Sequence, residues 1–548
     1  MSSNPADAGA SPNRAEAVAN KVNTKAAGIV GIAVMCSRIL GLVREQVFAG
    51  LFGGGRAMDA FTVAFRTPNL LRDLFAEGAL STAFVTTFSK TIATDGDQAA
   101  WRLANKVATV TAVALSVICL IGVAIAPYLV AIFAPGFDAE KVALTAMLAR
   151  IMYPFILLVS LAALVMGMLN AKQVFGMPAM ASSFFNLGSI AGGVALGYWI
   201  DPHFGQKALI GLACGTLIGG ALQLVVQIPS LWKLGYHFHP DFDWKDEGLR
   251  KILFLMVPAM VASSSVQLNV MINTMFASNL GEGPVFWLAI AFRLMQLPLG
   301  IFGVAIGTVT LPVLSRSIAE GNTGEFRNVL ARGMRLAFLL TVPSTIGLMM
   351  LAEPIISVLY QHGKFGAFET AQAGGALRFY AVGLCAYSAM KVLTPAFYAI
   401  DKRKTPMVVS FISVGLNLLF NWIFTFQLKW GHVGLAFSTG CVALANFFIL
   451  YALMRREVKS LETGTMLVTL LKVGIAGALL AFVCWAGQHW LLASWATQRL
   501  PVKLMYLVAT IAVGAVVFFA SAMALRVGEL EDVTALAKRK LGRFAKRA

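Results

Sequence analysis

The sequence predicts an all-α polytopic membrane protein, a class indicated by its composition and by its long apolar segments. Of the 548 residues, 58% are apolar and only 13% are charged, and the mean hydropathy is +0.75. Soluble globular domains are far less apolar than this. Because a membrane-spanning helix needs about 20 mostly apolar residues, the apolar segments of this chain predict about 14 transmembrane helices.

The predicted spanning segments follow one another along the whole chain. They cover residues 26–52, 57–89, 107–133, 143–170, 177–200, 208–232, 252–279, 285–314, 336–353, 374–400, 407–427, 431–454, 465–489 and 504–525. An even number of segments places both termini on the same side of the membrane. Most Lys and Arg residues outside these segments lie in the tails and loops of that side, so both termini are predicted to be cytoplasmic.

The two ends of the chain are polar. Residues 1–25 lack the apolar core and small-residue cleavage site of a signal peptide, so we expect the first apolar segment to act as the insertion signal. Residues 526–548 are basic and contribute to the net charge of +18. We interpret this basic tail as an orientation signal near anionic lipid headgroups, and we expect no nucleic-acid partner.

An internal repeat divides the apolar region. The tripeptide AFR at 64–66 recurs at 291–293, and Tyr153 matches Tyr380, both 227 residues later. This offset moves the chain by six helices, an even number, so the two halves share one orientation, as in several secondary transporters. The predicted domains are a polar tail (1–25), an N-terminal six-helix lobe (26–233), a cytoplasmic linker (234–251), a C-terminal six-helix lobe (252–456), two extra transmembrane helices (457–525) and a basic tail (526–548).

Charged residues are concentrated inside the first two apolar segments. A charge near the bilayer centre costs about 2.5–3.5 kcal/mol on insertion scales, so such residues are expected to face a protein interior or a water-filled cavity. The charged residues are Arg38, Arg44, Glu45, Asp59, Arg66, Arg72, Asp73 and Glu77, and the C-terminal half adds Arg293. One interpretation is that they are internal ion pairs holding the helices together.

The arginines outnumber the carboxylates in this set, which favours a second interpretation. A surplus of guanidinium groups in a low dielectric suits a dianionic or diphosphate ligand, because the planar fork of Arg binds phosphate oxygens bidentately. The sequence therefore predicts an anionic ligand in a cationic cavity.

No pattern in the sequence indicates a metal, a cofactor or a catalytic centre. The six cysteines stand singly in apolar segments, without the spacing of metal sites or disulfide frameworks. His, Asp and Glu residues show no metal-ligand spacing, and the phosphate-binding motif GxxxxGKS/T is absent. We expect no ATP hydrolysis, so transport by this chain would draw on a gradient or on the membrane potential.

Three stretches carry a family resemblance. SRILGLVRE (37–45), DAFTVAFRTPNLLRDLFAEGALSTAFV (59–85) and AFRLMQLPLGIFGVAIGTVTLPVLS (291–315) resemble the MurJ/MviN family of lipid II flippases. That family belongs to the multidrug/oligosaccharidyl-lipid/polysaccharide exporter superfamily, and the resemblance covers nearly the whole chain apart from the longer polar N-terminal tail. It implies alternating access of two six-helix lobes around a cationic cavity, with the two extra helices shaping a groove for a polyprenyl tail.

The resemblance also implies a set of site residues. The cavity arginines of the family fall on Arg38, Arg44, Arg72 and Arg293, and its acidic positions fall on Asp59 and Glu77. Our own interpretation of the charges adds Arg66 to this substrate-binding set.

The function implied by the resemblance is that of a flippase in the bacterial cytoplasmic (inner) membrane. It would move lipid II, the undecaprenyl-diphosphate-linked disaccharide-pentapeptide, from the inner to the outer leaflet for peptidoglycan synthesis, and so serve cell wall biogenesis and cell shape. The expected partners are lipid II, membrane lipids and the cell-wall synthesis machinery, and a monomer is expected.

Other functions are weighed against the flippase. An exporter of another polyprenyl-linked glycan would use the same charges, whereas a multidrug extruder of the same superfamily would need an acidic cavity. A glycosyltransferase would need a positioned carboxylate base or metal site. A scaffold protein would not need buried charge at all. We therefore predict a flippase and not an enzyme.

Overall fold

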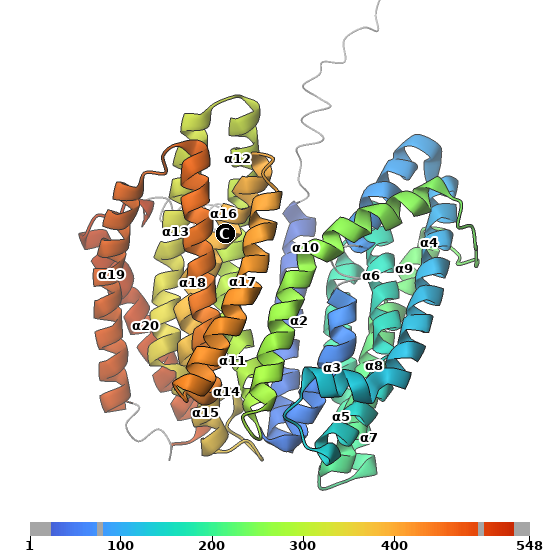
Figure 1. Cartoon of the computed structure of the whole chain (residues 1–548), viewed down its shortest axis with the longest axis horizontal. Coiled ribbons are helices and arrows are strands. Elements are labelled where there is room, and N and C mark those ends of the chain that lie inside the picture. The colour runs from blue at the N-terminus through green and yellow to red at the C-terminus, as the bar shows by residue number, and fades with distance from the viewer. Residues whose placement is uncertain (1–23, 74–79, 492–497, 531–548) are drawn as a thin grey trace, which may run out of the picture. The chain divides into compact units, whose positions relative to one another are not determined.

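The computed structural model describes residues 24–73, 80–491 and 498–530, and every regular element within these ranges is a helix (Figure 1). The longer helices are α2 (Thr24–Phe52), α3 (Arg56–Arg72), α4 (Ser81–Phe133), α5 (Ala139–Met152), α6 (Phe155–Ala171), α7 (Gly176–Ile200), α8 (Leu209–Val225), α9 (Ile228–Lys233), α10 (Glu247–Ser278), α11 (Pro284–Pro298), α12 (Val304–Ala319), α13 (Thr323–Met350), α14 (Ala352–Tyr360), α15 (Ala367–Tyr380), α16 (Leu384–Ala399), α17 (Lys404–Trp422), α18 (Gly431–Val458), α19 (Thr463–Ala486) and α20 (Leu500–Ala524). Short 3-10 or π-helical turns extend several of them: η2 (Gln206–Ala208), η3 (Leu299–Gly303), η4 (Ala381–Gly383), η5 (Ile423–Gln427) and η6 (Gly487–Leu491).

The predicted class of an all-α membrane protein is confirmed. Among the described residues, eleven helical stretches are long and apolar enough to cross a membrane. The predicted segments 26–52, 57–89 and 252–279 fall on α2, on α3 with the start of α4, and on α10. These three are not among the eleven stretches, so the number of fourteen spanning helices stays a prediction.

Several helix boundaries differ from the prediction for local reasons. α13 begins at Thr323, well before the predicted start at 336, because the side chain of Asn322 caps it by accepting a 3.0 Å hydrogen bond from the Glu325 N–H. The predicted segment 143–170 is two helices, and Pro154 at the start of α6 has no N–H to continue α5. A kink at Gly96, whose φ is 80°, lies within α4.

Helix boundaries and hydrogen bonds agree with the internal repeat. α5 and α7 begin at residues 139 and 176, and α15 and α17 begin 228 residues later. Arg150 Nε donates a 3.2 Å hydrogen bond to the carbonyl oxygen of Val123, and Arg378 Nε makes the same 3.2 Å bond to that of Met349. These two arginines therefore make similar bonds to the preceding helical region in the two halves.

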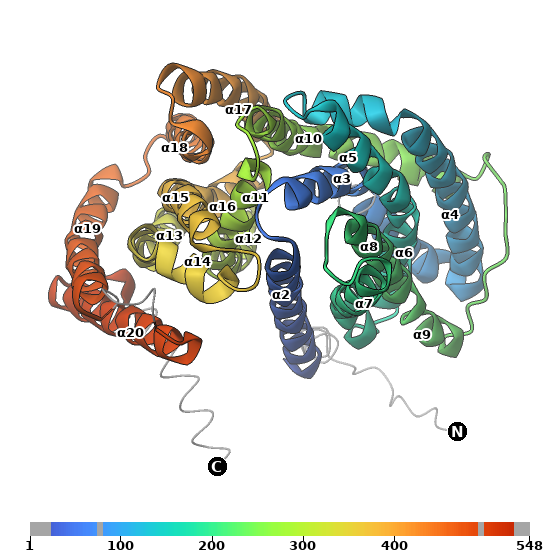
Figure 2. The same ribbon diagram turned by 90° about the horizontal axis from the view of Figure 1, so that it is seen from below.

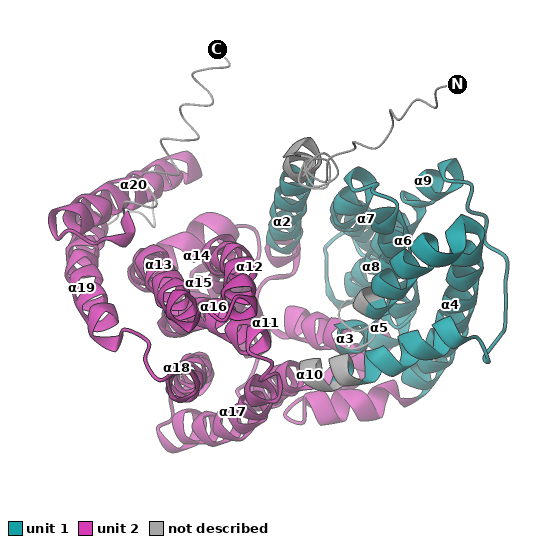
Figure 3. Ribbon diagram, turned by 90° about the horizontal axis from the view of Figure 1, so that it is seen from above, with its two compact units in different colours: residues 1–47, 68–124, 149–260 teal, residues 48–67, 125–148, 261–548 magenta. Residues whose placement is uncertain are grey.

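Contacts between Cα atoms divide the chain into two compact units (Figure 3). Unit 1 comprises residues 1–47, 68–124 and 149–260, and unit 2 comprises residues 48–67, 125–148 and 261–548. Several helices pass from one unit to the other, and in α3 the change falls between Thr67 and Pro68. The units are defined by contacts and not by the repeat, so the lobe boundaries at 26–233 and 252–456 stay a prediction.

Unit 1 is held together by close helix packing and an aromatic core. α7 and α8 lie side by side (Figure 2), and a Cβ atom at Gly211 would stand only 2.2 Å from the backbone nitrogen of Gly197. Only small residues allow two membrane helices to approach this closely. Next to this pair, the rings of Phe84 and Phe88 stack at 5.1 Å within a buried cluster that also includes Met168.

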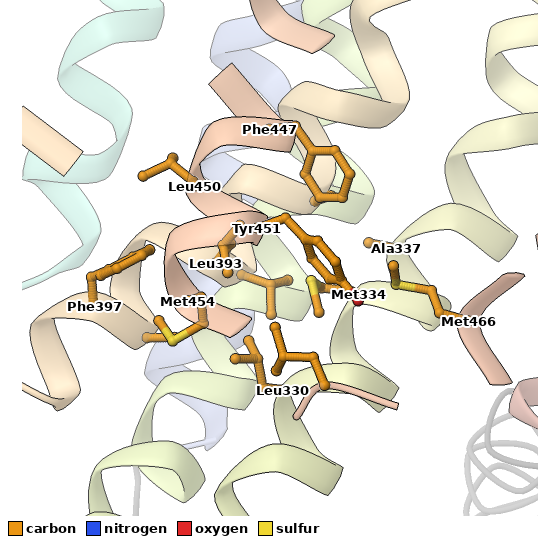
Figure 4. Close-up of a cluster of buried hydrophobic side chains, with 14 of the residues drawn as sticks. Leu330, Met334, Ala337, Leu393, Phe397, Phe447, Leu450, Tyr451, Met454 and Met466 are labelled. Atoms are coloured by element: carbon orange, nitrogen blue, oxygen red, sulfur yellow. The ribbon is translucent and has the colours of Figure 1, made fainter. Parts of the chain in front are cut away.

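Unit 2 has an apolar core between α13, α16 and α18. Leu330, Leu393 and Met454 are fully buried there, and Met466 at the start of α19 packs on the same cluster (Figure 4). A second cluster, which includes Leu339 of α13, joins α13 to α19 and α20. The two helices outside the repeat are thus packed against the C-terminal half.

An ion-pair triad fixes one end of the two extra helices. Arg335 of α13 donates from Nη1 to Glu462 Oε2 at 2.9 Å and from Nε to Glu529 Oε1 at 2.5 Å. Glu462 lies just before α19 and Glu529 just after α20, and the side chains of Arg335 and Glu529 are almost completely buried. One arginine therefore ties the start of α19 and the end of α20 to α13.

We expect Arg335→Ala to lower the melting temperature of the purified protein in detergent by several degrees. The substitution leaves the Glu529 carboxylate buried without its partner, and such losses are typically far larger than those of exposed pairs. Arg316→Ala is the matched control, because Arg316 forms an exposed pair with Glu320. Equal shifts in the two variants would contradict a structural role for the triad.

Candidate functional site

Unit 2 contains a pocket of about 490 Å³. It is bounded by α3, α10, α11, α15, α16, α17 and α18, and both polar and apolar residues line it. Its polar lining residues are Arg66, Ser265, Asn269, Asn273, Tyr380, Tyr387, Lys391, Thr394, Ser410, Ser413, Asn417, Thr439 and Asn446. Among the described residues, none that lines the pocket carries a carboxylate, and the charged lining residues Arg66 and Lys391 are cationic.

Arg66 enters this pocket from α3. Its Nη1 donates a hydrogen bond to Oγ1 of Thr274 on α10, and that hydroxyl in turn donates to the carbonyl oxygen of Val270 at 2.7 Å. Thr274 is fully buried. Arg293, another predicted site residue, lies on α11 of the same unit. Unit 2 thus holds two of the predicted site arginines.

Carboxamide side chains join three helices beside the pocket. Asn421 Nδ2 donates to Oδ1 of Asn273 at 2.8 Å and to Oδ1 of Asn417 at 3.0 Å. Asn273 Nδ2 donates to Oγ1 of Thr439 at 3.2 Å. These bonds connect α10, α17 and α18. The sequence analysis missed this network because it followed charges, although Asn269 with Asn273 and Asn417 with Asn421 repeat the i, i+4 spacing of one helix face.

Asp59 is completely buried at the start of α11. Its carboxylate accepts hydrogen bonds from the backbone N–H groups of Gly283 (2.6 Å) and Phe286 (2.9 Å). A carboxylate at this position satisfies N–H groups that lack a partner within the helix and complements its dipole. Gly283 has a φ of 103°, a conformation that glycine adopts without strain. Asp59 therefore attaches α3 to α11.

Lys141 of α5 is the ionic partner of Asp59. Its Nζ donates to Asp59 Oδ2 at 3.1 Å, and its side chain is 3% exposed. The sequence analysis missed Lys141, since it stands outside the predicted segment 143–170 and 82 residues away from Asp59. Asp59, a predicted substrate-binding residue, thus forms an ion pair within the protein. This agrees with the interpretation that the buried charges are internal ion pairs.

Arg56 forms a second ion-pair cluster one turn before Asp59. Its guanidinium group bonds both oxygens of Asp138, at 2.6 and 2.7 Å, and also contacts Glu282 at 3.1 Å and Glu140 at 3.3 Å. The Arg56 hydrogen bond holds the pKa of Asp138 well below its usual range. All four residues belong to unit 2. The cluster joins the start of α3 to the connections α4–α5 and α10–α11.

The remaining predicted site residues belong mostly to unit 1. Arg38 is exposed on α2, and Arg44 lies over the ring of Phe185 with 5.1 Å between the guanidinium carbon and the ring centroid. Arg72 bonds its neighbour Asp73 at 2.8 Å, an internal pair of the kind that the sequence suggested. Glu77 lies outside the described residues. Convergence of these arginines with Arg66 and Arg293 on one ligand stays a prediction.

The fold resembles those of two solved membrane proteins. A solved structure of a "Lipid II flippase MurJ, inward closed conformation" has a TM-score of 0.72 and 24% identity, and the match covers 90% of this chain and 99% of that one. An inward-facing multidrug resistance MATE family transporter of the MOP superfamily has a TM-score of 0.64 and 15% identity, with 78% and 96% covered. At these identities the likeness concerns the fold alone.

Sequence comparison then gives the family. The family model described as "Lipid II flippase MurJ" matches residues 48–506. A lipid II flippase MurJ from Burkholderia cenocepacia is 37% identical over 429 residues, which are 77% of this chain and 82% of that protein. A probable lipid II flippase MurJ from Haemophilus influenzae is 32% identical over 514 residues, covering 90% and 98%. The chain belongs to the lipid II flippase MurJ family.

We expect Asp59→Ala to reduce the amount of protein in the membrane, because it leaves the Lys141 ammonium buried without a counter-ion. Loss of one partner of a buried pair typically costs about 3–5 kcal/mol. The double variant Asp59→Asn with Lys141→Met should recover much of the abundance, and Glu140→Gln, at an exposed position, should leave it unchanged. Immunoblots of membrane fractions measure this. A double variant as scarce as Asp59→Ala would show that the two side chains are not coupled.

Proposed function

We propose that this protein is a lipid II flippase of the bacterial cytoplasmic (inner) membrane. It moves undecaprenyl-diphosphate-linked disaccharide-pentapeptide from the inner to the outer leaflet, where peptidoglycan is built. Membership in the lipid II flippase MurJ family, with the family model matching residues 48–506, carries this proposal. Both termini are cytoplasmic in this proposal, in line with the distribution of Lys and Arg.

The charges of the protein suit the head group of this substrate. A diphosphate offers several anionic oxygens, and each guanidinium group can bind two of them. Arg66 and Arg293 of unit 2 supply such groups, and Arg38, Arg44 and Arg72 of unit 1 supply three more. The proposed substrate-binding set also includes the acidic residues Asp59 and Glu77.

The proposed translocation step uses the two predicted lobes. In the proposed mechanism the lobes 26–233 and 252–456 open alternately to the two sides of the membrane. The head group crosses in the cavity, while the polyprenyl tail stays in lipid along the extra helices at 457–525. The chain acts as a monomer in contact with the cell-wall synthesis machinery, and no covalent bond of the substrate changes.

Two other transport functions fit the fold. A multidrug extruder would require carboxylates to bind a cationic drug, yet the charged residues described at the pocket of unit 2 are Arg66 and Lys391, and no described lining residue is a carboxylate. This observation places the extruder behind the flippase. An exporter of another polyprenyl-linked glycan would use the same arginines and differ only in the glycan that it carries.

The test is a measurement of which leaflet holds lipid II. Cells depleted of their own flippase and expressing this chain should present lipid II on the outer leaflet, whereas Arg72→Ala or Arg293→Ala should leave it inside at normal protein abundance. Lysine at these positions should restore function only in part, since Lys is a point charge without the bidentate fork.

Two results would contradict this assignment. Outward delivery of lipid II that is the same with and without the chain would reject the flippase. Alanine variants that vanish from the membrane, and that recover abundance and function when Asp73 is also neutralised, would show that the arginines are structural.

A truncation tests the role of the extra helices. Deletion of residues 465–548 should abolish flipping while both lobes still insert, because the polyprenyl tail is too long and too apolar to enter a cationic cavity. The leaflet measurement and an immunoblot of the membrane fraction provide the readouts. Full complementation by the truncated chain would rule out a lipid track at these helices.

A further inference from the structure

The connection between α9 and α10, residues 234–246, runs alongside α4 of the same unit (Figure 3). Tyr236 is buried, and its hydroxyl donates a 2.8 Å hydrogen bond to Oδ1 of Asn105 on α4. The same oxygen accepts a 3.2 Å bond from the backbone N–H of His239. The α9–α10 connection contains no helix or strand, so these bonds to α4 set its course.

This connection carries three exposed aromatic side chains. Phe238, Phe242 and Trp244 are each more than half exposed, although the bonds to α4 hold the backbone beside them. Trp232, at the end of α9, is exposed as well. A cluster of exposed apolar side chains on a fixed segment marks a surface that binds a partner or a membrane. Aromatic residues are typical of the level at which a bilayer meets water.

The α9–α10 connection lies at the end of a spanning helix. The backbone N–H of Asp241 donates a 3.1 Å hydrogen bond to Oγ1 of Thr109, near the start of the predicted spanning segment 107–133. Exposed apolar residues follow Thr109 on the same face of α4, at the spacing of successive helical turns; they are Val113, Val117 and Leu120. Non-helical backbone is not stable against the hydrocarbon core, so this depth corresponds to the headgroup region.

The surface continues into α10 on the other side. Phe254 and Val257 of this helix are largely exposed, within the same unit as the connection. The α9–α10 connection thus joins two apolar surfaces, that of α4 and that of the first part of α10. A bilayer that covers both helices also reaches the aromatic side chains between them.

The exposed charges of this region are mainly positive. Nζ of Lys106 on α4 donates to Oδ2 of Asp243 at 3.0 Å and to Oδ2 of Asp246 at 2.8 Å, so these two carboxylates are paired within the protein. The exposed charged side chains of residues 233–251 are Lys233, Lys245, Arg250, Lys251 and Glu247. Lysine and arginine at a membrane surface are attracted by anionic lipids.

We propose that the α9–α10 connection binds anionic phospholipid headgroups of the cytoplasmic leaflet. Phe238, Phe242 and Trp244 insert between the headgroups, the exposed cations contact the phosphates, and the bonds to α4 hold the segment at this depth. The leaflet follows from the predicted orientation of the chain. This inference goes beyond the proposed function, because it concerns lipids that are not the substrate.

Photocrosslinking tests this surface. p-Benzoylphenylalanine replaces Phe242 in the full chain, which is irradiated in nanodiscs of phosphatidylethanolamine with a minority of phosphatidylglycerol. Mass spectrometry should find lipid adducts in which phosphatidylglycerol is enriched at least twofold over its share of the bilayer. The matched control carries the same residue at the exposed position of Glu320, where α12 and α13 continue past their predicted spanning segments. It should give no lipid adduct.

Neutral variants test the role of charge. Lys245→Gln, Arg250→Gln and Lys251→Gln together should leave the adducts at position 242 but remove the enrichment of phosphatidylglycerol. Lys207→Gln, an exposed lysine before the opposite end of α8, should leave the enrichment unchanged.

Three results would overturn the inference. They are the absence of lipid adducts at position 242, adducts that only mirror the composition of the bilayer, and, in native membranes, adducts with another protein and none with lipid. The last result would identify a protein-docking surface instead. The leaflet measurement of lipid II does not depend on these experiments, so the proposed function would stand or fall separately.

Discussion

The packing of α3 in unit 2 depends on one buried carboxylate, that of Asp59. It accepts hydrogen bonds from the N–H groups of Gly283 and Phe286 at the N-terminus of α11, and it forms an ion pair with Lys141 of α5. Without Asp59, two helix-terminal donors and one ammonium group would be buried without acceptors, at a cost that few other substitutions would match. Arg56 and Arg66 stand on either side of Asp59 in α3, so the contacts of Asp59 also position these two arginines.

The sequence predicts the helical fold well and picks out the charges inside apolar segments, because both leave strong local signals; the substrate role of those charges stays a prediction. About 20 apolar residues mark a spanning helix. A charge within such a segment raises the free energy of membrane insertion so much that a structural or functional role is expected for it. Partners distant in sequence leave no such signal, as the pairing of Lys141 with Asp59 shows. Neutral amides are cheaper to bury, so the carboxamides around Asn421 passed unnoticed.

Unit 2 contains two kinds of polar group, guanidinium groups and carboxamides. They suggest that different parts of one head group are recognised by different side chains. Guanidinium groups attract any diphosphate, whatever is attached to it, because their interaction depends on charge. Carboxamides such as those of Asn273 and Asn421 contribute little to attraction at a distance, but they form hydrogen bonds only with partners at defined positions. Affinity and selectivity can therefore reside on different helices, with Arg66 of α3 beside the amides of α10 and α17.

The proline in α3 allows this helix to bend. Pro68 lies between Arg66 and Arg72, at the residue where α3 passes from unit 2 to unit 1, and it removes a backbone hydrogen bond that would otherwise stiffen the helix. Pro68 therefore lets the helical segments that carry Arg66 and Arg72 change direction relative to each other without unwinding either one.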